Sequence, residues 1–297
     1  MGLQSSGAIS LNEIHIEAGG SSGTQATIND SDIRALISKS SGAQMSFNEW
    51  YGASAGVTVT LSSGATNRDV SSLFGNNFSA SIAKILVINS GVEIGATNTG
   101  NYAIHVPSGM GGTLNIQNAG TISGAGGAGS SSGTGGAGGA AININSNNVT
   151  VTNTGTIRGG GGGGGRGANG SPGASSNVDG LFCCYGGSAG SGGAGGNGQG
   201  YNQSQSNGSG GGGGGAKYAY LCSGGGVGPS VIECDAQGIY SNGSGGSSGG
   251  NGGTYGNGGS QGGGGGSQGG SAGKYVNLGG GISYSLSNSG TLQGTAP

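Results

Sequence analysis

The sequence carries little charge. Only 6% of its 297 residues are Asp, Glu, Lys or Arg, against about a quarter in an average soluble protein. The formal net charge of -2 provides no basic face, so binding to the phosphates of a nucleic acid is not expected. The high net charge that keeps many chains disordered is missing as well. The composition therefore does not by itself predict disorder.

Hydrophobic residues are also scarce. They make up 31% of the chain, against about 45–50% in globular proteins, which argues against a large conventional core. No run approaches the ~18 apolar residues of a membrane-spanning helix. Residues 1–20 lack both the basic start and the apolar stretch of a signal peptide. We therefore expect synthesis in the cytoplasm and no membrane insertion.

Residues that usually serve catalysis or metal binding are few. His15 and His105 have no cysteine or carboxylate cluster at metal-ligand spacing. The glycine runs match the pattern GxGxxG by chance and lack the GK[ST] ending of a phosphate-binding loop. Glu233 and Asp235 are candidates for a glycosidase pair, but two such residues on a loop are more often solvated charges. The sequence predicts a protein without metal, cofactor or enzymatic activity.

The first of three zones, residues 1–53, holds most of the helix signals. The motifs SLNE from Ser10 and SFNE from Ser46 have the spacing of a capping box, and Asp30 precedes a further short segment. The apolar residues are too few for a large core, so the zone is expected to dock against a partner. A small self-contained helical cap is the alternative. Three glycines are expected to end these segments: Gly19, Gly42 and Gly52.

The second zone, residues 54–157, is typical of β-strands. A unit of alternating apolar residues ends in an Asn that is followed two residues later by Gly, which suits a tight turn. This strand, turn, strand pattern predicts a stack of the β-solenoid or β-prism type, completed by residues 283–297. Unrelated hairpins are the alternative. The units start at Ile85, Leu114, Val149 and Tyr284, and the paired turn residues are Asn89 and Gly91, Asn118 and Gly120, Asn153 and Gly155, and Asn288 and Gly290.

The third zone, residues 158–282, contains most of the 82 glycines. Long glycine runs without a strict triplet, together with four prolines in the whole chain, exclude collagen. One reading is a flexible linker, because glycine loses much backbone entropy on ordering. The other is a bundle of polyglycine II helices, whose backbones approach closely enough to hydrogen-bond to one another. The bundle requires both of its ends to be anchored.

Aromatic residues interrupt the glycine runs. Tyrosine among Ser, Gly and Asn is typical of binding loops, where a rigid ring gives contact area at low entropy cost. The alternative is that these rings cover the ends of the glycine lattice. The candidate binding residues are Phe182, Tyr185, Tyr201, Tyr218, Tyr220, Tyr240, Tyr255 and Tyr275.

All four cysteines also lie in this zone. Cys183 and Cys184 are adjacent, and either can form a disulfide with Cys222 or Cys234. A reducing cytoplasm argues against such a bond before release. The alternative is that the four thiols are free and buried.

Glycine runs that alternate with variable aromatic segments over residues 158–282 resemble the receptor-recognising adhesins of the long tail fibres of T-even-like phages. The resemblance implies a sandwich of polyglycine helices whose loops contact a host outer-membrane protein or surface glycan. Residues 1–53, with MGLQSSGAISLNEIHIEAGG, NDSDIRALIS and MSFNEWYGAS, resemble an N-terminal module of tailed-phage structural proteins. This second likeness implies docking to other tail-fibre or baseplate proteins in the virion, while association with a trimer stays open.

The expected fold is mostly β and irregular: a small helical N-terminal module, β-solenoid or β-prism-like repeats, and a polyglycine II bundle. The expected function is receptor binding at a fibre tip. A purely structural fibre or baseplate protein is the alternative, and ice binding by a flat glycine bundle is a third interpretation, which the bulky tyrosines disfavour.

Overall fold

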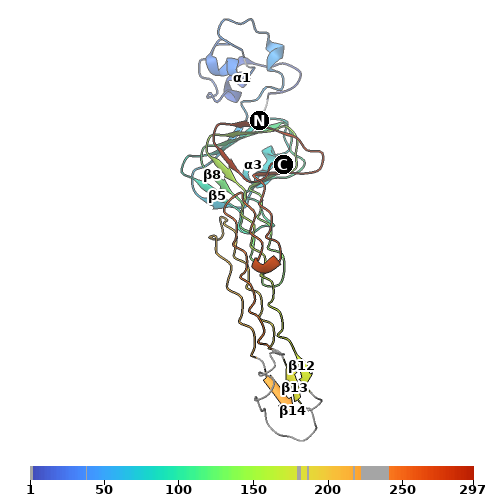
Figure 1. Cartoon of the computed structure of the whole chain (residues 1–297). Helices are drawn as coiled ribbons and strands as arrows, with labels where there is room; N and C mark the ends of the chain where they lie inside the picture. The colour runs from blue at the N-terminus through green and yellow to red at the C-terminus, as the bar shows by residue number, and fades with distance from the viewer. Residues whose placement is uncertain (1–2, 38, 179–181, 186, 217, 222–240) are drawn as a thin grey trace.

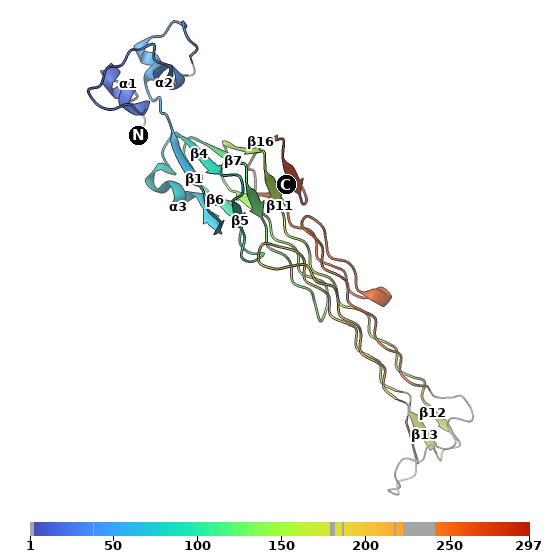
Figure 2. The ribbon, with the colours of Figure 1, turned by 90° about the vertical axis from the view of Figure 1, so that its left-hand side faces the viewer.

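The computed structural model describes residues 3–37, 39–178, 182–185, 187–216, 218–221 and 241–297. The molecule is elongated, with a small helical module at one end, then a stack of β-strands, a long glycine-rich shaft and a small antiparallel sheet at the far end (Figures 1 and 2). The fold is mostly β with few helices and with parallel sheets, in agreement with the predicted class. Among the described residues, no helix is both long and apolar enough to cross a bilayer.

The N-terminal module contains three short helices that begin where the sequence predicted. In the first, the Ser10 hydroxyl accepts a hydrogen bond from the Glu13 amide (3.2 Å), and the Glu13 carboxylate accepts one from the Ser10 amide (2.7 Å). The predicted stop at Gly42 is wrong for the second helix, which ends at Ala35, and the following Leu36 packs against the module's core. The helices are α1 (Leu11–Glu17), α2 (Ser31–Ala35) and the 3₁₀ helix η1 (Phe47–Trp50).

One tryptophan holds this module together. Trp50 is fully buried with Ile14 and Ile33, and its indole nitrogen donates a hydrogen bond to the Ile33 carbonyl (3.1 Å). Because the indole N–H has a partner, burying this large ring leaves no polar atom of it unpaired. The module thus has a small core of its own.

The β-stack consists of three parallel sheets; each of the first four turns of the chain adds one strand to each sheet, and the last turn adds a strand to the first and second sheets. Each strand inside a sheet therefore pairs with strands from the preceding and following turns, and the edge strands pair on one side. The first sheet contains β1 (Val57–Leu61), β4 (Ala83–Ile88), β7 (Thr113–Asn118), β10 (Val149–Asn153) and β16 (Tyr284–Asn288). The second contains β2 (Ala65–Thr66), β5 (Glu93–Gly95), β8 (Thr121–Ser123), β11 (Thr156–Arg158) and β17 (Thr291–Gln293). The third contains β3 (Arg68–Asp69), β6 (Ile104–Val106), β9 (Ile142–Ile144) and β15 (Val276–Leu278).

Aliphatic side chains at matching positions fill the centre of the stack. Leu86, Ile116 and Val151 lie in register on neighbouring strands, and all three are fully buried. The first turn is covered by α3 (Val70–Phe74), which is followed by the 3₁₀ helix η2 (Gly75–Asn77). At the opposite end Leu286 is 36% exposed, because β16 is an edge strand.

The predicted repeat is confirmed in three of its four copies. Asn118, Asn153 and Asn288 lie in register on β7, β10 and β16. For the first copy the predicted alignment is wrong by one residue, since Ile88 and not Asn89 pairs with Asn118. Ile88 faces the core and Asn89 is exposed in a longer turn, so the hydrophobic pattern sets the register.

The glycine-rich shaft is an insertion between two strands of one turn of the stack. The chain leaves after β11 and returns at β15, one strand earlier than the predicted return at Tyr284. Both ends of the shaft are therefore anchored in parallel sheets. A shorter glycine-rich excursion, residues 124–140, leaves between β8 and β9 and packs beside it.

Hydrogen bonds within the shaft recur at every third residue. The outward segment 159–175 pairs with the returning segment 187–199, and 204–216 and 241–253 form a second such pair (Figure 2). In the first pair the amides of Gly161, Gly164, Gly167, Gly170 and Gly173 donate to the carbonyls of Gln199, Gly196, Gly193, Gly190 and Gly187, in that order.

This spacing explains why the shaft needs glycine. A Cβ added at Gly164 would lie 2.0 Å from the carbonyl oxygen of Gly250 on a neighbouring segment. A contact that short is impossible without moving a backbone. The abundance of glycine in this zone is thus explained by the close approach of the backbones.

Candidate functional site

The far end of the shaft carries a three-stranded antiparallel sheet, β12 (Ser176–Val178), β13 (Phe182–Tyr185) and β14 (Tyr218–Leu221) (Figure 1). We call this sheet the tip. Its register places Tyr185 opposite Tyr218, Cys183 opposite Tyr220, and Phe182 opposite Leu221. Tyr185 is 43% exposed.

The tip therefore brings together four of the eight candidate binding residues, although they lie on strands far apart in sequence. These four are Phe182, Tyr185, Tyr218 and Tyr220. Tyr240 lies outside the described residues.

The cysteine alternatives stay predictions. Cys183 and Cys184 are on β13, opposite Tyr220 and Ala219 of β14. Cys222 and Cys234 lie outside the described residues, so the pairing of the four thiols is not decided by the fold.

The other three candidates lie at the opposite end of the shaft, where it joins the stack. Tyr201 is in the turn between two shaft segments, and its ring covers Gly95 at the end of β5, since a Cβ at Gly95 would lie 1.9 Å from the ring. Tyr255 is in the next turn of this kind, and Tyr275 packs on the core of the stack just before β15. Burial, together with the neighbouring Tyr275, raises the pKa of Tyr284 to about 12.

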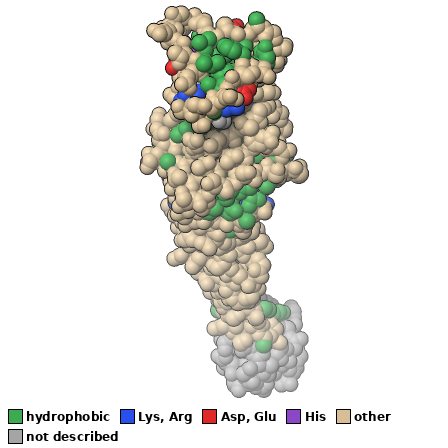
Figure 3. All heavy atoms as spheres, turned by 90° about the horizontal axis from the view of Figure 1, so that it is seen from above, with side chains coloured by type: hydrophobic (Ala, Val, Ile, Leu, Met, Phe, Trp, Pro, Cys, Tyr) green, Lys and Arg blue, Asp and Glu red, His purple; other side chains and the backbone are tan. Residues whose placement is uncertain are grey.

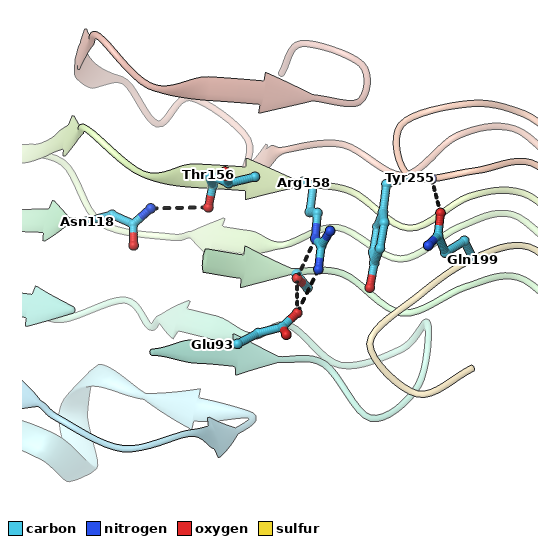
Figure 4. Close-up of polar contacts among 7 residues, drawn as sticks. Glu93, Asn118, Thr156, Arg158, Gln199 and Tyr255 are labelled. Carbon is cyan, nitrogen blue, oxygen red and sulfur yellow. Dashed lines mark hydrogen bonds and ion pairs between the residues drawn. The ribbon is translucent and has the colours of Figure 1, made fainter. Parts of the chain in front are cut away.

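A polar cluster fixes the shaft to the stack at this junction (Figure 4). The guanidinium carbon of Arg158 lies 3.7 Å from the centre of the Tyr255 ring, and the same guanidinium forms an ion pair with Glu93 (2.9 Å). The Ser123 hydroxyl accepts from Arg158 (2.9 Å) and donates to Glu93 (2.6 Å). Burial raises the pKa of Tyr255. Residues of three successive turns and of the shaft thus meet at one cation–π and ion-pair cluster.

An asparagine ladder inside the stack is a second structural site. The Asn118 side-chain amide donates to the side-chain Oδ1 of Asn153 (2.7 Å), and the Asn153 side-chain amide donates to Oδ1 of Asn288 (2.7 Å). Asn118 also donates to the Thr156 carbonyl (3.1 Å), which ties the first sheet to the second (Figure 4). Asn118 and Asn153 are buried. The repeat of Asn was visible in the sequence, but its mutual hydrogen bonding was not predicted.

We expect Asn153→Ala to lower the free energy of unfolding by about 2 kcal/mol, because it removes two hydrogen bonds, the one from the buried Asn118 amide to the Asn153 side chain and the one from Asn153 to Asn288. Thermal and denaturant unfolding of the full chain would measure this loss. Asn89→Ala is the control, since Asn89 is the Asn of the first copy but lies one residue beyond the position that pairs with Asn118 and is exposed, and a change below about 0.5 kcal/mol is expected there. Equal effects of the two substitutions would contradict the role given to the ladder.

No group of three or more His, Cys, Asp or Glu side chains that could hold a metal ion occurs in the part of the chain that the structure describes. The tip is a small sheet that contains aromatic residues, and the opposite end of the molecule is a helical module with its own small core. Chemically, this arrangement suits contact with a macromolecular surface.

Taken as a class, the molecule is an elongated mostly-β protein that presents an aromatic sheet far from its N-terminal module. The family model described as phage tail fibre adhesin Gp38 matches residues 56–297. The chain belongs to this family, which confirms the predicted resemblance and makes the chain a component of the virion's tail fibre.

One solved structure is similar over almost the whole chain. It is described as "Crystal structure of the gp37-gp38 adhesin tip complex of the bacteriophage S16 long tail fiber". The TM-score is 0.57 at 20% sequence identity, and the match covers 96% of this chain and 96% of that one. At this identity the likeness shows a shared fold. No curated protein matches the sequence.

Proposed function

We propose that this adhesin binds a host cell-surface receptor, an outer-membrane protein or a surface glycan, through the tip at the far end of its shaft. The observation that carries the proposal is the placement of four aromatic residues on β13 and β14 of one sheet, at the end of the shaft that lies away from the N-terminal module (Figure 1). Rigid aromatic rings are the residues that most often dominate binding energy at interfaces.

The scaffold is consistent with this role. Parallel strands of successive turns support a β-solenoid assignment for the stack, and the three-residue period of hydrogen bonds supports polyglycine II helices in the shaft. Such a shaft holds the tip away from the rest of the virion. Tyr201, Tyr255 and Tyr275 lie at the base of the shaft and fit the alternative role of covering the end of the glycine lattice.

The opposite end is proposed to dock to another tail-fibre protein. Hydrophobic side chains gather on the module at this end (Figure 3), and the exposed ones are Ile16, Phe47 and Tyr51. Large apolar side chains exposed together mark interaction surfaces. The similar solved structure is a complex of gp37 with gp38, which supports a fibre protein as the partner of this module. The proposal includes synthesis in the host cytoplasm and no enzymatic activity.

Binding of the purified full chain to intact candidate host cells, in competition with phage adsorption, tests the receptor proposal. Saturable binding that blocks adsorption is the expected outcome. Folded protein that neither binds susceptible cells nor reduces adsorption would favour a purely structural fibre protein instead.

We expect the double substitution Ile16→Ser, Phe47→Ser to weaken binding to the neighbouring tail-fibre subunit about tenfold or more, because both side chains are nearly half exposed and apolar. Co-purification with that subunit measures the loss, and an unchanged melting temperature shows that the module is folded. Leu286→Ser, which changes an exposed apolar residue of the stack, is the control. Wild-type binding by the double variant would place the docking surface elsewhere.

A further inference from the structure

We propose that a hollow on the side of the β-stack, separate from the tip, binds one neutral sugar ring of a surface polysaccharide. The hollow has a volume of 240 Å³ and is lined by Asn67, Asp69, Gly100, Asn101, Tyr102 and His105. Sites for drug-sized ligands usually measure about 300–1,000 Å³, so this one suits a single ring. We call it the side hollow.

Two residues that line the side hollow, Asp69 and His105, belong to a row of polar residues across the third sheet. Asp69 on β3 and His105 on β6 are register neighbours, and Asn143 on β9 and Asn277 on β15 continue the row. The Asn277 side-chain amide donates to the side-chain Oδ1 of Asn143 (2.8 Å), and the side-chain nitrogen of Asn143 lies 3.0 Å from Nδ1 of His105. In this orientation Asn143 donates to Nδ1, and the imidazole proton is therefore on Nε2. His105 thus offers the hollow an N–H donor.

Asp69 supplies the complementary acceptor. Its Oδ1 accepts hydrogen bonds from the Ser71 amide (2.8 Å) and hydroxyl (2.5 Å). All hydrogen bonds that the described residues make to Asp69 end on Oδ1. The second carboxylate oxygen, Oδ2, is left for a hydroxyl group. Sugar hydroxyls both donate and accept, and so can pair with Asp69 and His105 at once.

The wall of the side hollow is held in place before any ligand binds. The Asn67 side chain donates to the Thr97 hydroxyl (2.7 Å) and accepts from the Thr97 amide (3.0 Å). The Gly100 amide donates to the Asn98 side chain (3.0 Å). These bonds fix the segment between β5 and β6, so that little entropy is lost when the hollow is filled.

An aromatic surface completes the site. The rings of Tyr102 and His105 are stacked, with centroids 5.8 Å apart and an interplanar angle of 20°. A flat ring among hydrogen-bonding groups matches a sugar, which has both apolar C–H faces and polar edges. No Lys or Arg lines the side hollow, whereas the Asp69 carboxylate does. This charge disfavours phosphate and acidic sugars and selects a neutral ring.

Saturation-transfer NMR on the full chain tests the proposal, with D-glucose, D-galactose, N-acetyl-D-glucosamine and the acidic N-acetylneuraminic acid as separate probes. We expect transfer to at least one neutral sugar and none to the acidic one. Asp69→Asn keeps the Oδ1 acceptor for Ser71 but replaces Oδ2, and it should weaken binding about fivefold. Tyr102→Ala should do the same, and Tyr185→Ala at the tip should have no effect.

Three results would overturn the proposal: no transfer to any neutral sugar from folded protein, equal transfer to the acidic sugar, or undiminished binding in both Asp69→Asn and Tyr102→Ala. Melting curves of the variants show whether they are folded. If Tyr102→Ala is not folded, the binding result for Asp69→Asn alone decides the proposal. Competition by lipopolysaccharide with and without O-antigen then identifies the source of the ring. Because Tyr185→Ala affects only the tip, failure of the receptor proposal and failure of this one are distinguishable.

Discussion

Gly164→Ala is expected to lower the free energy of unfolding by about 3 kcal/mol, the upper part of the range for overpacked interiors. Gly164 is buried in the shaft, and the new methyl group would lie 2.0 Å from the carbonyl oxygen of Gly250. Gly164 and Gly250 also donate hydrogen bonds to Gly196 and Gly165, so moving either segment breaks the regular pairing around it. Denaturant unfolding of the full chain, followed by circular dichroism, measures the change.

Gly213→Ala is the matched control on the same shaft. A Cβ at Gly213 meets nothing within 4 Å, and the residue is exposed. Alanine there restricts the unfolded chain, so the variant should be as stable as the wild type or more stable by up to about 1 kcal/mol. If both substitutions had the same small effect, the shaft would not depend on the close approach of its backbones.

The second large effect is expected at the tip. We predict that Tyr218→Ala with Tyr220→Ala abolishes binding to host cells while the melting temperature of the rest of the molecule stays unchanged. The two residues lie on β14, opposite Tyr185 and Cys183 of β13. Loss of one dominant aromatic contact costs about 2 kcal/mol or more, roughly thirtyfold in affinity, and loss of two takes binding below detection. Cell binding and phage adsorption assays measure it.

Tyr201→Ala tests whether a tyrosine at the base of the shaft binds the receptor or only covers the end of the glycine segments. Tyr201 was also a candidate binding residue, yet it lies at the base of the shaft with its ring over Gly95. We expect this variant to bind cells as well as the wild type and to lose some stability. Strong adsorption by the Tyr218 and Tyr220 double variant, or lost adsorption by folded Tyr201→Ala, would move the receptor-binding surface from the tip to the base.

The three zones of the fold could be predicted from the sequence because each zone has its own composition. Capping signals at Ser10 and Ser46 placed two helix starts in the N-terminal module, and the Asn and Gly repeat placed three of the stacked turns. The strands of the third sheet were not predicted. They contain two or three residues each, which is too short for a period-two pattern to be recognised.

The distribution of the tyrosines was beyond sequence reasoning for a different reason. Tyr201 and Tyr218 both follow glycine-rich runs, but one is at the base of the shaft and the other at the tip. The end of the shaft at which a turn lies depends on how many segments run outward and back before it. A glycine run does not show in the sequence whether its segment runs toward the tip or toward the stack. The side hollow was missed likewise, since Asp69 and His105 become neighbours only through the pairing of β3 with β6.

The three-residue period of the shaft also sets how its length can change. Removing one or two glycines from the segment 187–199 would bring amides to positions where the neighbouring segments offer no carbonyl, whereas removing three restores the pattern. At the polyproline II rise of about 3.1 Å per residue, the reach of the adhesin is therefore adjustable only in steps of roughly 9 Å. Each step also requires matching deletions in all the segments that run to the tip. The strands of the tip lie outside this hydrogen-bond pattern, so substitutions there leave the spacing of the shaft unchanged.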